Sequence, residues 1–270
     1  MRLSTVLIGT VLIGTVPIGT VLISTALIGT SMTLAAAAAT PPAGASAADA
    51  HAGNGDQFAP LTLTASSARI PLEKSKSTAG YISAKSGIKT VSATFEVPEI
   101  TNCTSSENTG MGPVVILVGK NYFVGAGAEA ECQSGTTSYL IAINHNGTET
   151  HPLTVSAKDK ISVQVTIGSK NVEVKIEDLT TGHKTSQALS KRKVTDAEFG
   201  DDSLSEGSKQ VPIPKFTDHE FSSAKVNGKV LRDASPLLDE ELVKGKTVLI
   251  KAGAFNKAGD SFTMLFEHAS

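Results

Sequence analysis

One carboxylate is a candidate for chemistry because of the residues beside it. Glu198 lies between Ala197 and Phe199 in the segment Asp196-Ala197-Glu198-Phe199. A carboxylate that faces a protein interior has its pKa raised by desolvation, which suits a general acid or base. The alternative is a solvated glutamate at the rim of a sheet, on an edge strand. The residues alone leave both interpretations open.

Other kinds of site find little support in the spacing of polar residues. The six histidines are scattered, without a His-Glu-x-x-His motif or a paired-cysteine motif, so we expect no metal site and no cofactor. Asp201, Asp202 and Glu206 lack the spacing of a calcium loop, and we expect a solvated acidic loop there. No Gly-x-Ser-x-Gly elbow exists, and Gly125-Ala126-Gly127 has no third glycine for a phosphate loop.

The composition favours strands, and the charge balance argues against electrostatic binding to nucleic acid. The 270 residues include no tryptophan and carry a net charge of −2. Valine, isoleucine and threonine are common, and they are typical of strands. No basic stripe with interleaved aromatic residues is present, so we expect no nucleic-acid partner. The two cysteines, Cys103 and Cys132, are too few for a disulfide framework, but one bridge between them is expected if the protein is exported.

The segment 160–181 is the clearest structural element. Its apolar residues alternate strictly with polar ones on two arms, which predicts two strands that each have one apolar face. The apolar positions are Ile161, Val163, Val165, Ile167, Val172, Val174 and Ile176. Residues 168–171 supply the turn of a hairpin. A hairpin buries too little apolar surface to be stable alone, so a second sheet must cover it.

The remaining chain repeats this pattern. From Gly80 onward, short strands are separated by turn signals every 8–12 residues, and only Leu237–Val243 is predicted to form a helix. The pattern predicts an all-β domain over residues 78–270, an antiparallel β-sandwich of two long bent sheets, as in concanavalin-like folds. We expect the domain to be a monomer.

The N-terminal residues resemble a targeting segment. Residues 1–47 contain pentapeptide repeats such as Val6-Leu-Ile-Gly-Thr10 and end in Ala45-Ser46-Ala47, which a signal peptidase would accept. We therefore expect a secreted product without a stable membrane span. The apolar stretch is long enough to cross a bilayer, so an uncleaved anchor with the domain outside is the alternative. Residues 48–77 are predicted to be a flexible lead or propeptide-like arm, with a marginal strand at Leu61–Thr64.

The order of motifs in the sandwich region resembles the glutamic peptidase (eqolisin) family. The resemblance covers about Gly80 to Ala224, and it lies in the order and spacing of the motifs together. The segments that carry it are Gly80-Tyr81-Ile82, residues 91–98, Val118-Gly119, Glu129-Ala130-Glu131-Cys132, Ser138-Tyr139, residues 177–182, residues 196–199, Val211-Pro212, Phe216 and Phe221.

The resemblance implies a secreted endopeptidase with a glutamate and a glutamine on the concave face of a β-sandwich. The glutamate acts as general base on a water molecule and then as acid to the leaving amine. The glutamine amide binds the water and stabilises the oxyanion. The glutamate position falls at Glu198. The glutamine position falls at Gly125, which has no side-chain amide. Gln133 is close in sequence, but it falls in a predicted turn, so we do not expect its side chain to replace the missing amide.

Further departures concern the walls of the cleft. The family's cleft tryptophans correspond to Leu117 and Ala142, and its cleft acids correspond to Asn121 and Asn144. Two functions follow as hypotheses. The first is a degenerate member, weakly active or inactive, whose concave face binds a polypeptide or a glycan, with Asn121 and Asn144 as candidate binding residues. The alternative is an active acid endopeptidase that uses Glu198 and an unrecognised oxyanion donor.

Overall fold

The computed structural model describes residues 70–106, 108–206 and 209–270. The targeting segment expected at residues 1–47 and the marginal strand expected at residues 61–64 lie outside these ranges. Within the ranges the chain is built of strands, with one short 3-10 helix, η2 (Leu231–Asp233). None of its helices is long and apolar enough to span a membrane.

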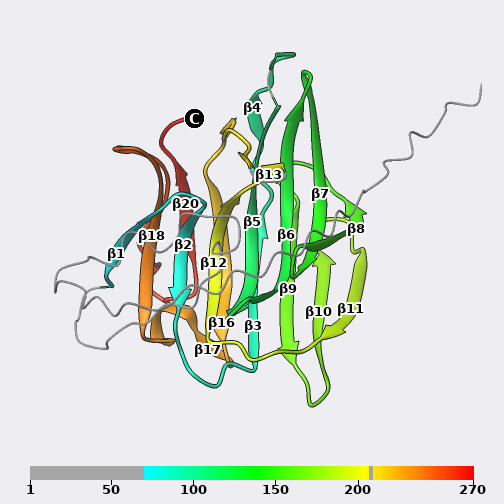
Figure 1. Cartoon of the computed structure of the whole chain (residues 1–270), viewed down its shortest axis with the longest axis vertical. Helices are drawn as coiled ribbons and strands as arrows, with labels where there is room; N and C mark the ends of the chain where they lie inside the picture. Colours follow the sequence, from blue (N-terminus) through cyan, green and yellow to red (C-terminus); the bar gives the residue numbers. More distant parts are fainter. Residues whose placement is uncertain (1–69, 107, 207–208) are drawn as a thin grey trace, which may run out of the picture. The chain divides into compact units, whose positions relative to one another are not determined.

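The strands follow one another along the chain with short connections (Figure 1). They are β1 (Leu72–Ser75), β2 (Thr78–Ser83), β3 (Thr90–Glu96), β4 (Ile100–Asn102), β5 (Asn108–Gly119), β6 (Tyr122–Gln133), β7 (Thr136–His145), β8 (Thr148–Thr154), β9 (Lys160–Ile167), β10 (Asn171–Asp178), β11 (Lys184–Ser190), β12 (Asp196–Ser203), β13 (Ser205–Glu206), β14 (Lys209–Gln210), β15 (Lys215–Phe216), β16 (His219–Val226), β17 (Lys229–Val230), β18 (Leu237–Lys244), β19 (Thr247–Ala252) and β20 (Phe262–Phe266).

The main sheet is a continuous path that doubles back on itself. Its order is β11-β10-β9-β3-β16-β20-β19-β18-β2-β12-β5-β6-β7-β8, and neighbours along it pair antiparallel. Strands β3, β9, β10 and β16 of one half contact β5, β6 and β12 of the other half. The predicted all-β antiparallel sandwich is therefore confirmed, with its two layers joined through β20, β19 and β18.

The hairpin expected at residues 160–181 is strands β9 and β10. Val172 pairs with Ile167 and Ile176 pairs with Val163 across the hairpin. Ile161, Val163 and Val165 are fully buried, and they belong to the core that the two layers enclose. The period-two pattern thus predicted both the strands and the face that each one buries.

The helix predicted at Leu237–Val243 is wrong. The segment forms strand β18, which pairs with β2 on one side and β19 on the other. Leu238 and Leu242 are both buried. A separation of four residues places side chains on one face of a helix, but also on one face of a strand, because four is even. The two neighbouring strands decide between them by supplying backbone hydrogen-bond partners.

The sheet also begins earlier than residue 78. Strand β1 lies in the segment 48–77 that was expected to be a flexible lead, and it pairs in parallel with β18. Ser75 and Ser77 are buried. At least the last residues of the lead therefore belong to the folded domain.

The solvated loop predicted around Asp201 and Asp202 is also wrong, because both residues lie in β12 and are buried. Strand β12 is central in the sheet, between β2 and β5. Asp201 points into the core, where its Oδ1 lies 2.9 Å from Nε2 of His219 on β16. Neither side chain of this pair is exposed to solvent. A buried carboxylate needs such a partner to offset its desolvation.

Cys103 and Cys132 are joined by a disulfide bond that links the segment after β4 to the end of β6. We expect replacement of both cysteines by serine to lower the free energy of unfolding by about 3 kcal/mol, because the bridge closes a loop of 29 residues in the unfolded chain. Urea unfolding of the variant and of the wild type measures this difference. Equal stability of the two proteins would contradict the expectation.

Candidate functional site

Strand β12 places Glu198 in the middle of the sheet, and not at its rim. Glu198 lies opposite Ile82 of β2 and Ile116 of β5. Its neighbours Ala197 and Phe199 point the other way, into the core. Glu198 is only 5% exposed. The interpretation as a solvated residue on an edge strand is therefore wrong for this side chain.

A row of paired residues leads from Glu198 across the sheet to the predicted glutamine position. Ile116 pairs with Gly125 of β6, and Gly125 pairs with Asn144 of β7. Since paired residues in adjacent strands point to the same face, Glu198 and Gly125 share one face, with the aliphatic Ile116 between them. The structure thus brings the two positions that the resemblance predicts to one surface, and of the two only Glu198 has a side chain with a functional group.

The backbone around Gly125 leaves no room for a side chain. A Cβ atom at this position would lie 2.3 Å from the carbonyl oxygen of Val115 and 2.6 Å from Cγ2 of Ile116. Such contacts are far inside van der Waals distance, and one of them is to backbone. A glutamine could be restored here only if strands β5 and β6 moved apart.

Two other carboxylic acids lie near Glu198. Asp202 follows it on the same face of β12, and Glu240 comes from β18. Asp202 is 8% exposed and Glu240 is 3% exposed. Burial, followed by the charges of Asp202 and Glu240, raises the pKa of Glu198 well above its ordinary value. Burial also raises the pKa of Asp202 to about 7 and that of Glu240 to about 7.

Glu198 and Asp202 interact closely. The contact between their carboxyl groups is one of the causes that raise the pKa of Glu198, and it opposes the rise for Asp202. Glu198 Oε1 is buried without a hydrogen-bond partner, and no side-chain amide among the described residues bonds to this carboxyl group. Glu240 accepts a hydrogen bond from the hydroxyl of Thr78. The site is therefore a cluster of acids, and not a pair of an acid and an amide.

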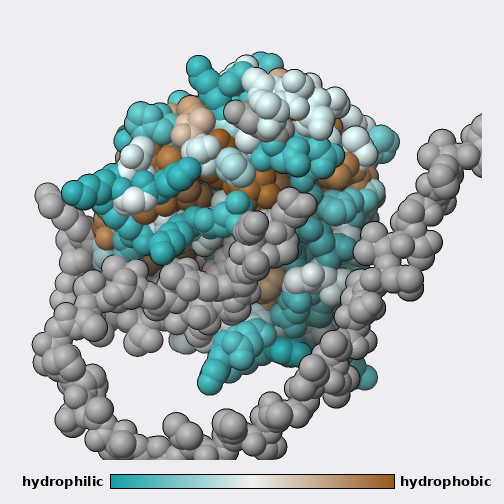
Figure 2. Space-filling view, turned by 45° about the horizontal axis from the view of Figure 1, so that its top comes forward, coloured by the Kyte–Doolittle hydropathy of each residue, from teal (hydrophilic) through white to brown (hydrophobic). Residues whose placement is uncertain are grey.

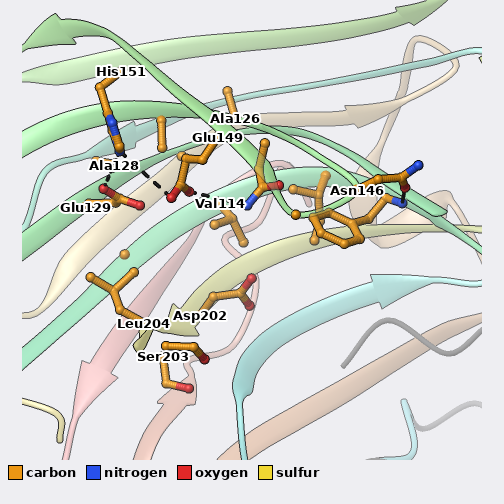
Figure 3. Close-up of a pocket in the computed structure, with 18 of the residues that line it drawn as sticks. Val114, Ala126, Ala128, Glu129, Asn146, Glu149, His151, Asp202, Ser203 and Leu204 are labelled. Carbon is orange, nitrogen blue, oxygen red and sulfur yellow. Dashed lines mark hydrogen bonds and ion pairs between the residues drawn. The ribbon is translucent and has the colours of Figure 1, made fainter. Parts of the chain in front are cut away.

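A cavity of about 940 Å³ opens beside this cluster (Figure 3). Its floor consists of small and aliphatic residues of β5, β6 and β7, including Val114, Ile116 and Ala142. Asp202 reaches the cavity, whereas Glu198 and Gly125 are not among the residues that line it. Figure 2 shows apolar residues between hydrophilic ones on the face that it presents. A partly apolar cavity with polar groups on its walls is typical of ligand sites.

The two asparagines predicted as binding residues both line this cavity. Asn144 lies on β7, and its Nδ2 donates a hydrogen bond to Glu149 Oε1 at 3.3 Å. Asn121 lies in the turn between β5 and β6, with a φ of 52°. Both residues therefore line one cavity, and their role in binding stays a prediction.

Sequence reasoning missed Asp202 and Glu240 as partners of Glu198. Asp202 was detectable, because residues four apart on a strand share a face. Glu240 was not detectable, since the segment that carries it was assigned to a helix and pairs with β2 only through the long-range order of the sheet.

Comparisons with known proteins agree with this architecture. The model of the Peptidase A4 family matches residues 76–256. The fold is similar to that of scytalido-glutamic peptidase in complex with a transition state analog inhibitor (TM-score 0.61, 20% identity, 71% of this chain and 98% of that chain). It is also similar to SCP-B of the eqolisin family in complex with the tripeptide Ala-Ile-His (TM-score 0.58, 20% identity, 71% and 98%).

Aspergilloglutamic peptidase from Aspergillus niger is a further structural relative (TM-score 0.51, 22% identity, 59% of this chain and 99% of that chain). No curated protein sequence matches the chain. At these identities the structural relatives establish the fold alone. Because the family model covers more than half of the residues, the chain belongs to the Peptidase A4 family, the glutamic peptidases or eqolisins.

Proposed function

We propose that this protein is a degenerate glutamic peptidase whose concave face binds polypeptide and hydrolyses it weakly or not at all. The support for binding is the cavity of about 940 Å³ and its mixed lining, together with the complex of the relative SCP-B with a tripeptide. The support for weak chemistry is the loss of the glutamine while the glutamate position is kept.

The observation that carries the proposal is the environment of Gly125. This position offers no side-chain amide, and its surroundings would not accept one without movement of β5. Loss of one oxyanion donor costs about 10²–10³ in rate. Burial of Glu198 at 5% exposure further separates the remaining acid from a bound peptide.

The proposal predicts that the purified protein digests denatured casein neither at about pH 3–4, where ordinary carboxylic acids titrate, nor at about pH 7, where the raised pKa values place Asp202 and Glu240. Release of acid-soluble peptides measures digestion. The matched controls are Glu198→Gln and Glu177→Gln, the second of which changes a glutamate on β10 paired with Lys184. Digestion by the wild type that disappears in Glu198→Gln and persists in Glu177→Gln would contradict the proposal.

Binding is tested separately from hydrolysis. Fluorescence anisotropy with labelled casein peptides is expected to show saturable binding, which Val114→Trp weakens because the indole fills the floor of the cavity. Equal binding by the wild type and by this variant would place the ligand elsewhere. An absence of binding by the wild type would contradict the proposed function itself.

A second candidate function, acid peptidase activity, is favoured by the placement of two buried acids, Glu198 and Asp202, on one face of β12. Two carboxyl groups that share one proton can act as base and acid together. In that case the protonated carboxyl group of Asp202 would donate the hydrogen bond to the oxyanion that the glutamine amide donates in the family pattern. Asp202→Asn would then abolish digestion as completely as Glu198→Gln.

We also infer export of the protein from the hydrophobic segment 1–47. Its pentapeptide repeats and the Ala45-Ser46-Ala47 sequence support cleavage by a signal peptidase. N-terminal sequencing of the protein recovered from culture medium is expected to begin after Ala47. Recovery of the uncleaved chain in the membrane fraction would favour an N-terminal anchor instead.

A further inference from the structure

Three metal-ligating side chains converge at one end of the cavity. Glu129 comes from β6, while Glu149 and His151 come from β8. Strand β7 lies between them, so β6 and β8 are about 10 Å apart. Ala142 of β7 lines the same cavity, and its methyl group leaves space above the strand. The long side chains from both sides can therefore meet over β7 (Figure 3).

The distances are close to those of a metal centre. His151 Nε2 lies 2.8 Å from Glu129 Oε2 and 3.9 Å from Glu149 Oε2. All three ligand atoms lie within 4.8 Å of one another. Ligand atoms around one tetrahedral zinc ion are about 3.3 Å apart, since each lies about 2.0–2.2 Å from the metal. Small rotations of two partly exposed side chains, Glu149 and His151, would complete this geometry.

Unpartnered buried oxygen atoms on the walls of the cavity also indicate a cationic ligand. Asn144 donates its Nδ2 to Glu149, and its Oδ1 is buried without a hydrogen-bond partner. Asp202, which is 8% exposed, also lines the cavity and has a buried Oδ1 without a partner. Buried acceptors are rarely left unsatisfied in proteins, because each costs about 1–3 kcal/mol.

The acidic residues along the cavity also favour a cationic ligand. The carboxylates among its described lining residues are Glu129, Glu131, Glu149 and Asp202, and the arginine among them is Arg192. Arg192 directs Nη1 toward the carbonyl oxygen of Asn121 at 3.5 Å, and no ion pair joins it to one of these acids. These acids are therefore available to a cation, which would displace the protons that burial favours on Glu129 and Asp202.

We propose that Glu129, Glu149 and His151 form a binding site for a divalent transition-metal cation, with Zn²⁺ preferred. One imidazole nitrogen and two carboxylate oxygens are a ligand set that suits Zn²⁺, whereas Mg²⁺ and Ca²⁺ prefer oxygen ligands throughout. Asn144 lies beside this ligand set, because its Nδ2 group donates a hydrogen bond to Glu149 Oε1. The sequence predicted no metal site because Glu149 and His151 have the i, i+2 spacing of a strand and not the spacing of a zinc-binding helix.

Calorimetric titration tests this site. The purified protein, stripped of metal with a chelator and dialysed, is expected to bind one equivalent of Zn²⁺. Glu129→Gln and His151→Gln are each expected to weaken binding at least about tenfold, since even indirect support of a metal ligand is worth about 10–100-fold. His183→Gln is the matched control, because His183 is an exposed histidine whose ring contacts Thr181 and lies outside the cavity lining. Its affinity for Zn²⁺ should equal that of the wild type.

A second measurement needs no variant. Substoichiometric Mn²⁺ or Co²⁺ should broaden or shift the NMR resonances of one histidine ring, assigned to His151, and leave those of His219 in the core unchanged. Absence of Zn²⁺ binding, or equal affinities of the wild type, Glu129→Gln and His151→Gln, would overturn the proposal. The site does not depend on whether the protein is a peptidase, so this result and the casein result are independent.

Discussion

The free energy of unfolding is expected to fall by several kcal/mol as the pH rises from about 4.5 to about 7.5. The cause is the acid cluster around Glu198. Burial raises the pKa of Asp202 to about 7 and that of Glu240 to about 7, and it raises the pKa of Glu198 still more clearly. In the unfolded chain these groups titrate near about 4. The folded state therefore holds protons that the unfolded state has already released.

The sign follows from this difference in bound protons. Below about pH 4 both states are protonated, and the cluster contributes its full stability. Between the unfolded and folded pKa values only the folded state binds the protons, so stability falls with rising pH. For Asp202 alone the shift corresponds to about 4 kcal/mol, and the contributions of the three acids are not additive because they interact. Asp239, with a pKa raised to about 7 by burial, acts in the same direction.

Urea unfolding at a series of pH values measures the slope. Asp202→Asn and Glu240→Gln are expected to flatten it and to raise the stability at pH 7.5, because a neutral amide keeps the shape and adds no buried charge. Glu177→Gln is the control, since Glu177 forms its ion pair with Lys184 at a partly exposed position. A wild-type stability that stays constant or increases over this range would contradict the assignment of these acids as buried and protonated.

The fold could be predicted from the sequence wherever local alternation decided the outcome. In β9 and β10, Ile161 to Ile176 alternate with polar residues and identify both the strands and their buried face. In β18, the spacing of Leu238 and Leu242 fits a helix and a strand equally well, and the pairing with β2 and β19 decides. Local pattern alone contains no information about that pairing.

The candidate site could be predicted only in part. Glu198 and Gly125 were identified by resemblance, and the sheet places them on one face. Asp202 was missed because the charged segment after Glu198 looks like a surface loop, and Glu240 was missed because its segment was predicted to be a helix. Both segments are buried between strands, and the partners of their acids are distant in the chain: His219 contacts Asp201, and Thr78 contacts Glu240. No local sequence pattern identifies hydrogen-bond partners that come from distant strands.

Breaking the core pair between Asp201 and His219 is expected to be among the most destabilising single changes in the domain. Asp201→Ala should lower the free energy of unfolding by about 3–5 kcal/mol, because it leaves a buried histidine without its partner. The 2.9 Å contact lies between β12 and β16, in the opposite layers of the sandwich, beside Phe216 and Phe221. Water cannot replace the lost carboxylate there, since neither side chain is exposed.

The matched experiment is a double-mutant cycle with His219→Leu and Asp201→Leu. Each single variant leaves one buried polar group unpaired, whereas the double variant removes both and fills the space with apolar atoms. We therefore expect the double variant to be more stable than either single variant and to approach or exceed the wild type. Additive losses in the cycle would show that the two residues act independently. In that case the contact with His219 would not offset the desolvation cost of burying the Asp201 carboxylate on the core face of β12.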